Sequence, residues 1–420
     1  MRPLHSLSLM PPGPPKRSSS PKSKKPPTSN TMKTLYKLPL LDPNTTDGFK
    51  DISLDDGTGW SVDTYTLRGG LQEGVQVVEI NNGKLCFAVL PTRGMGIWKG
   101  QYGKVFLGWD SPVKDPVNPA FINLQDRGGL GWLKGFNEWF VRCGLNSMGA
   151  PAMDTVLDNS GNAFDVPLTL HGNIANIPAR AVSIEITEEA IILSGEVDET
   201  MMFGPALRLN TEIRTEFGSG AMTITDTVTN LGDNSQEHEM LYHINYGASL
   251  LEKGSRIVAP FKQVAPRDPR SVEGIGTFDQ YGAPEVGFVE QAYLYELAGQ
   301  RGSRETLTML RNAAGDQASL LRFTLKDFPC FTLWKNTAGQ ADGYVTGLEP
   351  ATNYPNSRRF EREKGRVLSL AGGESRTTRI TIETLDTKTA IRAAEAEIKK
   401  LQKTAKGTVQ PEPVARLSGS

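Results

Sequence analysis

The feature that most constrains this chain is a succession of short apolar or alternating segments separated by turn residues. Residues 75–80 and 85–90 flank Asn81-Asn82-Gly83, and an Asn-Gly pair between two such runs is the turn chemistry of a β-hairpin. Further strand-like runs lie at 182–186, 191–197, 207–214, 222–228, 320–325, 330–334 and 377–384. Because no regular helices separate these runs, the sequence predicts an all-β protein of antiparallel sheets.

One helix is expected after the strands. Residues 388–404 are rich in Ala, Glu and Lys, and their apolar residues recur on one stripe: Ile391, Ala394, Ile398 and Leu401. This pattern predicts an amphipathic helix docked on a sheet, followed by a loose tail. We therefore expect one domain of two stacked sheets over residues 35–386, with a C-terminal helix and tail over 387–420.

The first 34 residues differ in charge from the rest of the chain. They hold seven Lys or Arg, no acidic residue and many Pro and Ser, which predicts a disordered basic extension over residues 1–34. Subtracting those seven from the 46 basic residues leaves 39, against 47 acidic residues, or a net charge of about −8. A body of this sign excludes nucleic acid as the expected partner and suits a neutral or cationic small molecule.

The cysteine count and the sequence motifs limit which compartment and which cofactors are expected. Three cysteines give no disulfide framework and no spaced set of metal ligands, which indicates a reducing compartment. The N-terminus lacks the apolar core of a secretory signal and no apolar run reaches about 18 residues, so we expect a cytoplasmic protein without a membrane span. No phosphate-binding or dinucleotide-binding glycine motif stands in a proper context, and we expect neither a cofactor nor a metal.

Histidines are scarce, and one of the four lies in the basic extension. His171 follows a short apolar segment and precedes Gly172, which lets backbone or a ligand approach closely. On a regular strand, His243 and Asn245 share one face and His238 lies on the other, which favours His243 for a site and leaves His238 at the surface or in a supporting role. The alternative for each histidine is an ordinary structural position.

Glu349 ends an apolar run and enters a loop rich in Pro and Asn. Pro350 restricts the backbone of Glu349, so the carboxylate is held in place. A glutamate and two histidines are sufficient for general acid–base chemistry near neutral pH. The alternative is that Glu349 is a solvated or paired carboxylate at the end of a strand.

Two other segments combine polar and aromatic residues. One places an arginine between Pro91 and Gly94, and the other runs over residues 135–146 and includes Trp139, with Trp132 just upstream. An aromatic face beside a few fixed polar groups suits a sugar, although such aromatics are equally common in a core. The expected substrate-binding residues are Arg93, Asn137, Arg142, Asn146, Asn245 and Asn353.

Five segments, in this order, resemble the galactose-mutarotase-like superfamily (the aldose 1-epimerases), and within it the DUF4432 branch. They are LPTRGMGIWKG at 90–100, EWFVRCGLNSMGAP at 138–151, LHGNIA at 170–175, YHINYG at 242–247 and GLEPATNYP at 347–355. The resemblance covers about residues 50–385. It implies a β-supersandwich of antiparallel sheets, which agrees with the strand pattern.

The resemblance also implies roles for three residues. His171 matches a histidine that helps to bind and polarise the sugar, His243 matches one that donates a proton to the ring oxygen, and Glu349 matches a carboxylate that takes the proton of the anomeric hydroxyl. These roles imply a cofactor-independent aldose 1-epimerase whose partner is a small-molecule sugar. Two alternatives stay open: another isomerase or lyase acting on a modified sugar, and a non-catalytic carbohydrate-binding protein.

Overall fold

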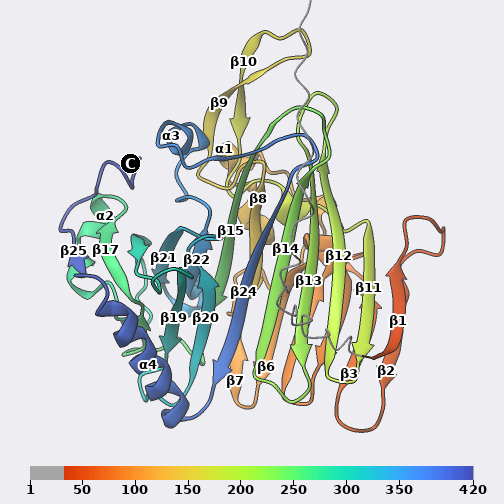
Figure 1. The fold of residues 1–420 in the computed structure, drawn as a ribbon, viewed down its shortest axis with the longest axis horizontal. Helices are drawn as coiled ribbons and strands as arrows, with labels where there is room; N and C mark the ends of the chain where they lie inside the picture. Colours follow the sequence, from red (N-terminus) through yellow and green to blue (C-terminus); the bar gives the residue numbers. More distant parts are fainter. Residues whose placement is uncertain (1–32, 420) are drawn as a thin grey trace, which may run out of the picture.

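The computed structural model describes residues 33–419, which form two large sheets and a separate two-stranded hairpin (Figure 1). The first sheet has nine strands in the order β1-β11-β12-β13-β14-β24-β20-β19-β16. These strands are β1 (Thr34–Leu41), β11 (Ala181–Thr187), β12 (Ala190–Thr200), β13 (Ala206–Glu216), β14 (Ala221–Asn230), β24 (Ser375–Leu385), β20 (Ala318–Thr324), β19 (Glu305–Arg311) and β16 (Arg256–Val258).

The second sheet has fourteen strands, with β15 between β8 and β22 near its centre. In spatial order they are β2 (Ser53–Asp55), β3 (Ser61–Thr66), β4 (Gln76–Asn81), β5 (Leu85–Leu90), β6 (Gly96–Tyr102), β8 (Phe140–Leu145), β15 (Gln236–Tyr246), β22 (Tyr344–Ala351), β21 (Cys330–Thr337), β18 (Gln291–Leu297), β17 (Phe261–Pro266) and β25 (Thr408–Val409), with β7 (Val105–Leu107) on β6 and β23 (Leu368–Leu370) on β15.

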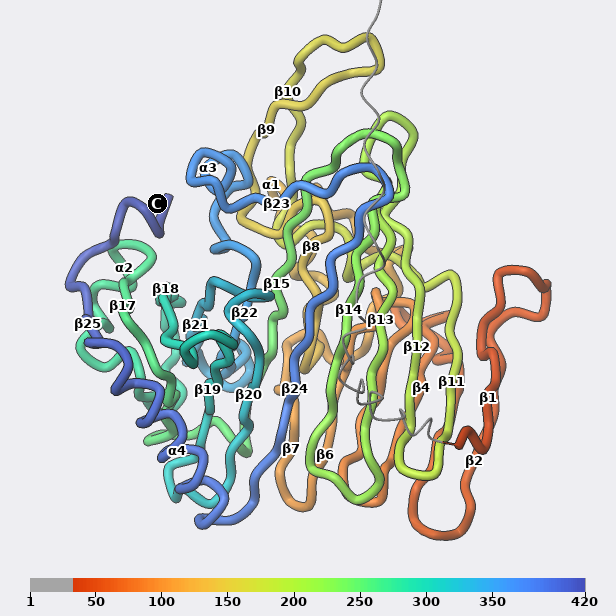
Figure 2. The backbone as a smooth tube through the Cα atoms, viewed as in Figure 1, coloured from red at the N-terminus to blue at the C-terminus, as the bar shows by residue number. Residues whose placement is uncertain are grey.

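Outside the two sheets, the described residues form a hairpin, four α-helices and seven short 3-10 helices. The hairpin of β9 (Ala152–Leu157) and β10 (Ala163–Leu168) stands beyond the ends of the sheets (Figure 2). The α-helices are α1 (Asp126–Gly129), α2 (Pro269–Val272), α3 (Arg358–Glu363) and α4 (Lys388–Gln402). None of the helices within residues 33–419 is long and apolar enough to cross a membrane.

The main core lies between the two sheets. Every second residue is buried along β14, and along β12 from Ile191 onward, as expected for strands with one face toward solvent. The three central strands of the other sheet, β8, β15 and β22, are instead buried on both faces. Phe140, Tyr242 and Ile244 face the main core, whereas Val141, Cys143 and Leu241 belong to a second apolar cluster on the opposite face. That opposite face carries the site described below.

The predicted all-β class of antiparallel sheets with a C-terminal helix is confirmed. The Asn-Gly hairpin forms between β4 and β5, and helix α4 spans Lys388–Gln402. The helix buries Ile391, Ala394 and Ile398 against a cluster that includes residues of β19 and β20. The extension predicted over residues 1–34 lies, up to residue 32, outside the described residues, and Thr34 already begins β1.

The segment after α4 is docked, so the expectation of a loose tail is wrong. Strand β25 pairs in parallel with β17, and the Gln410 amide donates to the Val264 carbonyl. Further on, Leu417 is buried and its carbonyl accepts a hydrogen bond from Asn356 Nδ2 at 2.8 Å. The tail is held because it supplies an extra strand and an apolar plug that the sequence pattern alone does not reveal.

Candidate active site

Strands β15 and β22 bring the second histidine and the glutamate together. The register pairs Ile244 with Leu348, which puts Glu349 opposite His243 on the outer face of the sheet. His243 Nε2 lies 3.2 Å from Glu349 Oε1, and both side chains are at most 5% exposed. Residues 106 positions apart in the chain therefore share one buried polar contact.

Gly347 makes room for this contact. A Cβ atom at position 347 would lie 2.7 Å from His243 Cε1 and 2.8 Å from Glu349 Oε1. Both distances are shorter than any ordinary van der Waals contact. The glycine in the GLEP segment is thus required by the close approach of the two side chains above it.

Asn245 fixes the tautomer of His243. Its amide nitrogen donates to the carbonyls of Glu138 and His243, at 3.0 and 3.2 Å. The amide oxygen therefore faces His243 Nδ1, at 2.6 Å, and acts as the acceptor. Nδ1 must carry a hydrogen, and the Nε2 atom that faces Glu349 has its lone pair available whenever the ring is neutral.

His171 reaches the same site from a strained turn. Its φ is +59°, and Gly172 follows with a φ of +68°. A side chain on Gly172 would collide with the Ser147 carbonyl, at 1.9 Å. His171 Nδ1 bonds to the Met148 carbonyl at 3.0 Å, and the ring centroid lies 5.5 Å from that of His243. Because a carbonyl can only accept, Nδ1 is the donor and Nε2 of the neutral ring is left as an acceptor.

The three side chains line a cavity of about 360 Å³, which lies in the low range for small-molecule sites. Trp132, Phe136 and Trp334 form aromatic walls, and Arg267 and Glu290 are also part of the lining. The ring of Trp132 lies 4.6 Å from that of His171. A larger hollow of about 540 Å³ lies on the open face of the nine-stranded sheet, and its lining includes no histidine among the described residues.

Burial dominates the electrostatics of the three groups. It lowers the pKa of His171 to about 4, although the bond to the Met148 carbonyl opposes the shift. It lowers the pKa of His243 to about 3, and the neighbouring His171 adds to the effect. Burial raises the pKa of Glu349 well above its usual range, although the charge of Arg267 opposes this. Burial by itself therefore favours a neutral His243 and a protonated Glu349, which share one proton.

The structure does not place the two predicted binding arginines in the pocket. Arg142 faces the main core, where its Nε lies 2.6 Å from Asp226 Oδ2 on β14. Arg93 Nε lies 2.6 Å from Glu138 Oε1, and both side chains are fully buried. Each guanidinium is occupied by a carboxylate inside the protein, so the expectation that they bind substrate is corrected: both join segments of the scaffold.

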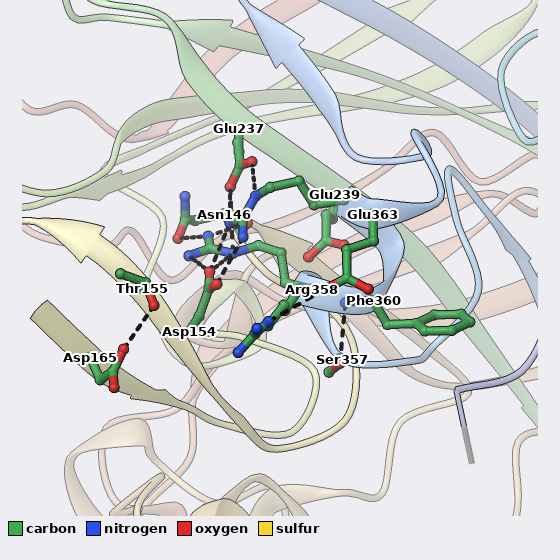
Figure 3. Close-up of polar contacts among 12 residues, drawn as sticks. Asn146, Asp154, Thr155, Asp165, Glu237, Glu239, Ser357, Arg358, Phe360 and Glu363 are labelled. Carbon is green, nitrogen blue, oxygen red and sulfur yellow. Dashed lines mark hydrogen bonds and ion pairs between the residues drawn. The ribbon is translucent and has the colours of Figure 1, made fainter. Parts of the chain in front are cut away.

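The predicted asparagines are likewise absent from the described residues that line the pocket. Asn137 Nδ2 donates to the Val113 carbonyl at 3.2 Å. Asn146 Oδ1 accepts from Arg358 at 2.7 Å, beside Asp154 at the base of the β9–β10 hairpin (Figure 3). These two side chains are held by partners in the scaffold and do not line the pocket.

Asn353 supports the site indirectly. Its Nδ2 donates to Glu239 Oε1 at 2.7 Å, and the other oxygen of Glu239 accepts from the Met148 amide at 3.2 Å. The Met148 carbonyl in turn holds His171. Asn353 and Asn245 are therefore positioning residues, and the expectation that they contact substrate is corrected as well.

His238 lies on the face of β15 opposite to His243, as predicted, but it is buried and not at the surface. Its Nδ1 bonds to the Leu145 carbonyl at 3.0 Å. The polar and aromatic residues of the pocket wall that the sequence did not predict are Arg267, Glu290, Thr332 and Trp334. Thr332 is the cross-strand partner of Glu349, and its Oγ1 is buried without a hydrogen-bond partner. Its strand was predicted, but nothing local marked which face would meet the pocket.

Comparisons with known proteins identify the family of the chain. The model of the family described as "Domain of unknown function (DUF4432)" matches residues 72–384. The chain belongs to this family. Its match covers all the residues that form the histidine–glutamate contact. A search of curated proteins finds no match.

Solved structures place the DUF4432 chain among galactose mutarotase-like folds. A Klebsiella pneumoniae protein that carries a provisional aldose 1-epimerase name is 33% identical, with a TM-score of 0.83 over 90% of this chain and 99% of that one. A galactose mutarotase-like protein of Clostridium acetobutylicum is 13% identical, with a TM-score of 0.56 over 78% and 99%. A galactose 1-epimerase of Lactobacillus acidophilus is 10% identical, with a TM-score of 0.50 over 78% and 99%. The last two show a shared fold only.

Proposed function

We propose that this protein is a cofactor-independent epimerase of the aldose 1-epimerase type, which interconverts the anomers of a monosaccharide or a monosaccharide derivative. The observation that carries the proposal is the contact between His243 Nε2 and Glu349 Oε1, at 3.2 Å, in a pocket with aromatic walls. Opening a cyclic hemiacetal requires one proton to leave the anomeric hydroxyl and one to reach the ring oxygen. A carboxyl group and an imidazole at one pocket can perform both transfers.

In this mechanism His243 donates to the ring oxygen and Glu349 accepts the proton of the anomeric hydroxyl. The aldehyde then rotates about its C1–C2 bond and closes on its other face, with the two transfers reversed. The donor form of His243 needs a proton that burial disfavours on an imidazole. Transfer of the shared proton from Glu349 to Nε2 creates the imidazolium and the carboxylate together, so no proton has to enter from solvent.

The other lining residues support a sugar as the substrate. The rings of Trp132, Phe136 and Trp334 offer flat apolar faces for C–H groups. His171 Nε2 is left as an acceptor for a hydroxyl, because Nδ1 is held by the Met148 carbonyl. In this proposal His171 orients the sugar as a neutral base and does not donate to it.

The test is anomer exchange. The purified protein is added to anomerically pure sugars, and the approach to equilibrium is followed by polarimetry or by NMR exchange between the α and β signals. Accelerated exchange for at least one sugar is expected. Saturable binding without exchange would instead identify a carbohydrate-binding protein. A product that differs in constitution or mass from both anomers would identify another isomerase or a lyase.

A further inference from the structure

Arg267 and Glu290 form a charged pair on the wall of the pocket. Arg267 follows β17 and Glu290 precedes β18, and these strands are neighbours in the sheet. Arg267 Nη2 lies 3.8 Å from Glu290 Oε1, which is too long for a hydrogen bond. The side chains are 30% and 50% exposed, so the pair stands where the pocket meets solvent.

Both members of the pair are oriented by neighbours. Arg267 Nη2 lies 3.2 Å from Asp268 Oδ2, and Asp268 caps the N-terminus of α2. Glu290 Oε2 accepts a hydrogen bond from Trp334 Nε1 at 2.8 Å. Trp334 in turn lies 5.4 Å, ring to ring, from His243. The carboxylate is therefore tied to the aromatic wall that faces the histidine–glutamate contact.

A guanidinium only donates hydrogen bonds, and a carboxylate only accepts them. Two hydroxyls on adjacent carbons of a sugar match such a pair: the oxygen of one hydroxyl can accept from the guanidinium, and the hydrogen of the other can be donated to the carboxylate. We propose that Arg267 and Glu290 read a pair of adjacent hydroxyls on the part of the sugar that does not react, and that Glu290 excludes anionic sugars. The assignment of the ligand as a sugar rests on the proposed function.

The exclusion follows from charge. Among the described residues that line the pocket, Arg267 is the only lysine or arginine. Its charge already faces the carboxylates of Asp268 and Glu290. A phosphate or carboxylate on the sugar would have to approach Glu290 to reach the guanidinium, and two like charges at short range repel. Neutral hydroxyls meet no such barrier.

The experiment compares wild type with Glu290→Gln for binding and exchange of a neutral aldose, its 6-phosphate and its uronate. Glutamine keeps the acceptor for Trp334 Nε1 and removes only the charge. The neutral sugar should bind about tenfold more weakly, as expected for one charge-assisted hydrogen bond, with kcat within about twofold. The two anionic sugars should bind more tightly than they do to wild type. Glu296→Gln is the matched control, because Glu296 is a partly exposed carboxylate on β18 that pairs with Arg416 away from the pocket.

Arg267→Met provides a second readout if Glu290→Gln unfolds, and it should weaken binding of the neutral sugar by about the same factor. The inference is overturned if wild type binds the phosphate or the uronate as tightly as the neutral sugar. It is also overturned if either variant binds the neutral sugar as wild type does. Binding of neutral sugars without any anomer exchange would reject the proposed function and leave the recognition role of the pair standing. Absence of any sugar binding would reject both.

Discussion

His243 Nε2 and Glu349 Oε1 lie 3.2 Å apart on the neighbouring strands β15 and β22, which are buried on both faces. The contact is possible because residue 347 has no side chain and because Asn245 leaves Nε2 pointing at the carboxyl group. Two residues with shifted pKa values of opposite direction, joined by one proton, are suited to move that proton to and from a bound hemiacetal.

Replacing the carboxyl group should stop the proposed reaction. Glu349→Gln keeps the shape of the side chain and removes its ability to take a proton, so anomer exchange should fall at least about a hundredfold. The measurement is NMR exchange with substrate in excess. Glu363→Gln, an exposed carboxylate on α3, is the control and should exchange at the wild-type rate. A Glu349→Gln variant with unchanged exchange would remove Glu349 from the mechanism.

The role of the missing side chain at residue 347 can be tested without replacing a polar group. In Gly347→Ala the new methyl would lie 2.7 Å from His243 Cε1, so the imidazole or the carboxyl group must shift. Misplacement of reacting groups by about 1 Å costs on the order of a hundredfold in rate, and kcat should fall by about that factor. Gly276→Ala, where an added Cβ meets nothing within 4 Å, is the control. A wild-type kcat in Gly347→Ala would show that the close approach of His243 and Glu349 does not contribute to catalysis.

The pH dependence should lack the inflection of an ordinary histidine. Burial lowers the pKa of His243 to about 3, so the pair gains a second proton only far below pH 6.5, and Glu349 keeps the shared proton through neutral pH. After subtraction of the uncatalysed rate, kcat/KM should be flat through pH 6.5. An acid limb centred near pH 6.5 would mean that His243 titrates as it would in water.

The buried arginine between the sheets should matter for stability and not for substrate. In Asp226→Asn, Arg142 would lose its partner inside the core, and such a loss costs about 3–5 kcal/mol of unfolding free energy. Chemical denaturation measures it, while KM should stay at the wild-type value. Asp198→Asn breaks a partly exposed bidentate pair with Arg208 on the neighbouring strands and should cost less than about 1 kcal/mol. A raised KM in Asp226→Asn would instead indicate that Arg142 contributes to substrate binding.

His238 predicts acid sensitivity of the fold. Burial lowers its pKa to about 4, below the value of about 6.5 expected in the unfolded chain. As the pH falls from 6.5 to 4, His238 binds a proton in the unfolded state but not in the folded state. This group therefore lowers the free energy of unfolding by about 1.4 kcal/mol per pH unit. In His238→Gln, denaturation at a series of pH values should give a slope smaller by that amount. An unchanged slope would mean that His238 takes up its proton in the folded protein.

The strands and the face of His243 could be predicted because side chains alternate between the two faces of a strand, and this alternation is visible in the local sequence. The same alternation separates Arg142 from Cys143, but it does not say which of the two faces the main core. On β8 every residue is buried, so apolar content marks neither side. Arg142 could be placed only once Asp226, on the other sheet, was seen beside it.

The pocket wall escaped prediction for a related reason. Arg267 and Glu290 stand at strand ends next to turns, where charged residues are usually solvated. Their meeting depends on the pairing of β17 with β18 and on the position of Trp334. Asn353 looked like a ligand contact because its own partner, Glu239, is more than a hundred residues away.

The docked C-terminal segment bears on how the protein can be handled. Ser418 Oγ donates to the Arg267 carbonyl, so the last described residues touch the backbone of a residue in the pocket wall. An affinity handle or fluorescent fusion attached just past Ser418 would emerge beside that wall and perturb it. A fusion ahead of β1, at the far edge of the nine-stranded sheet, would leave it undisturbed (Figure 1).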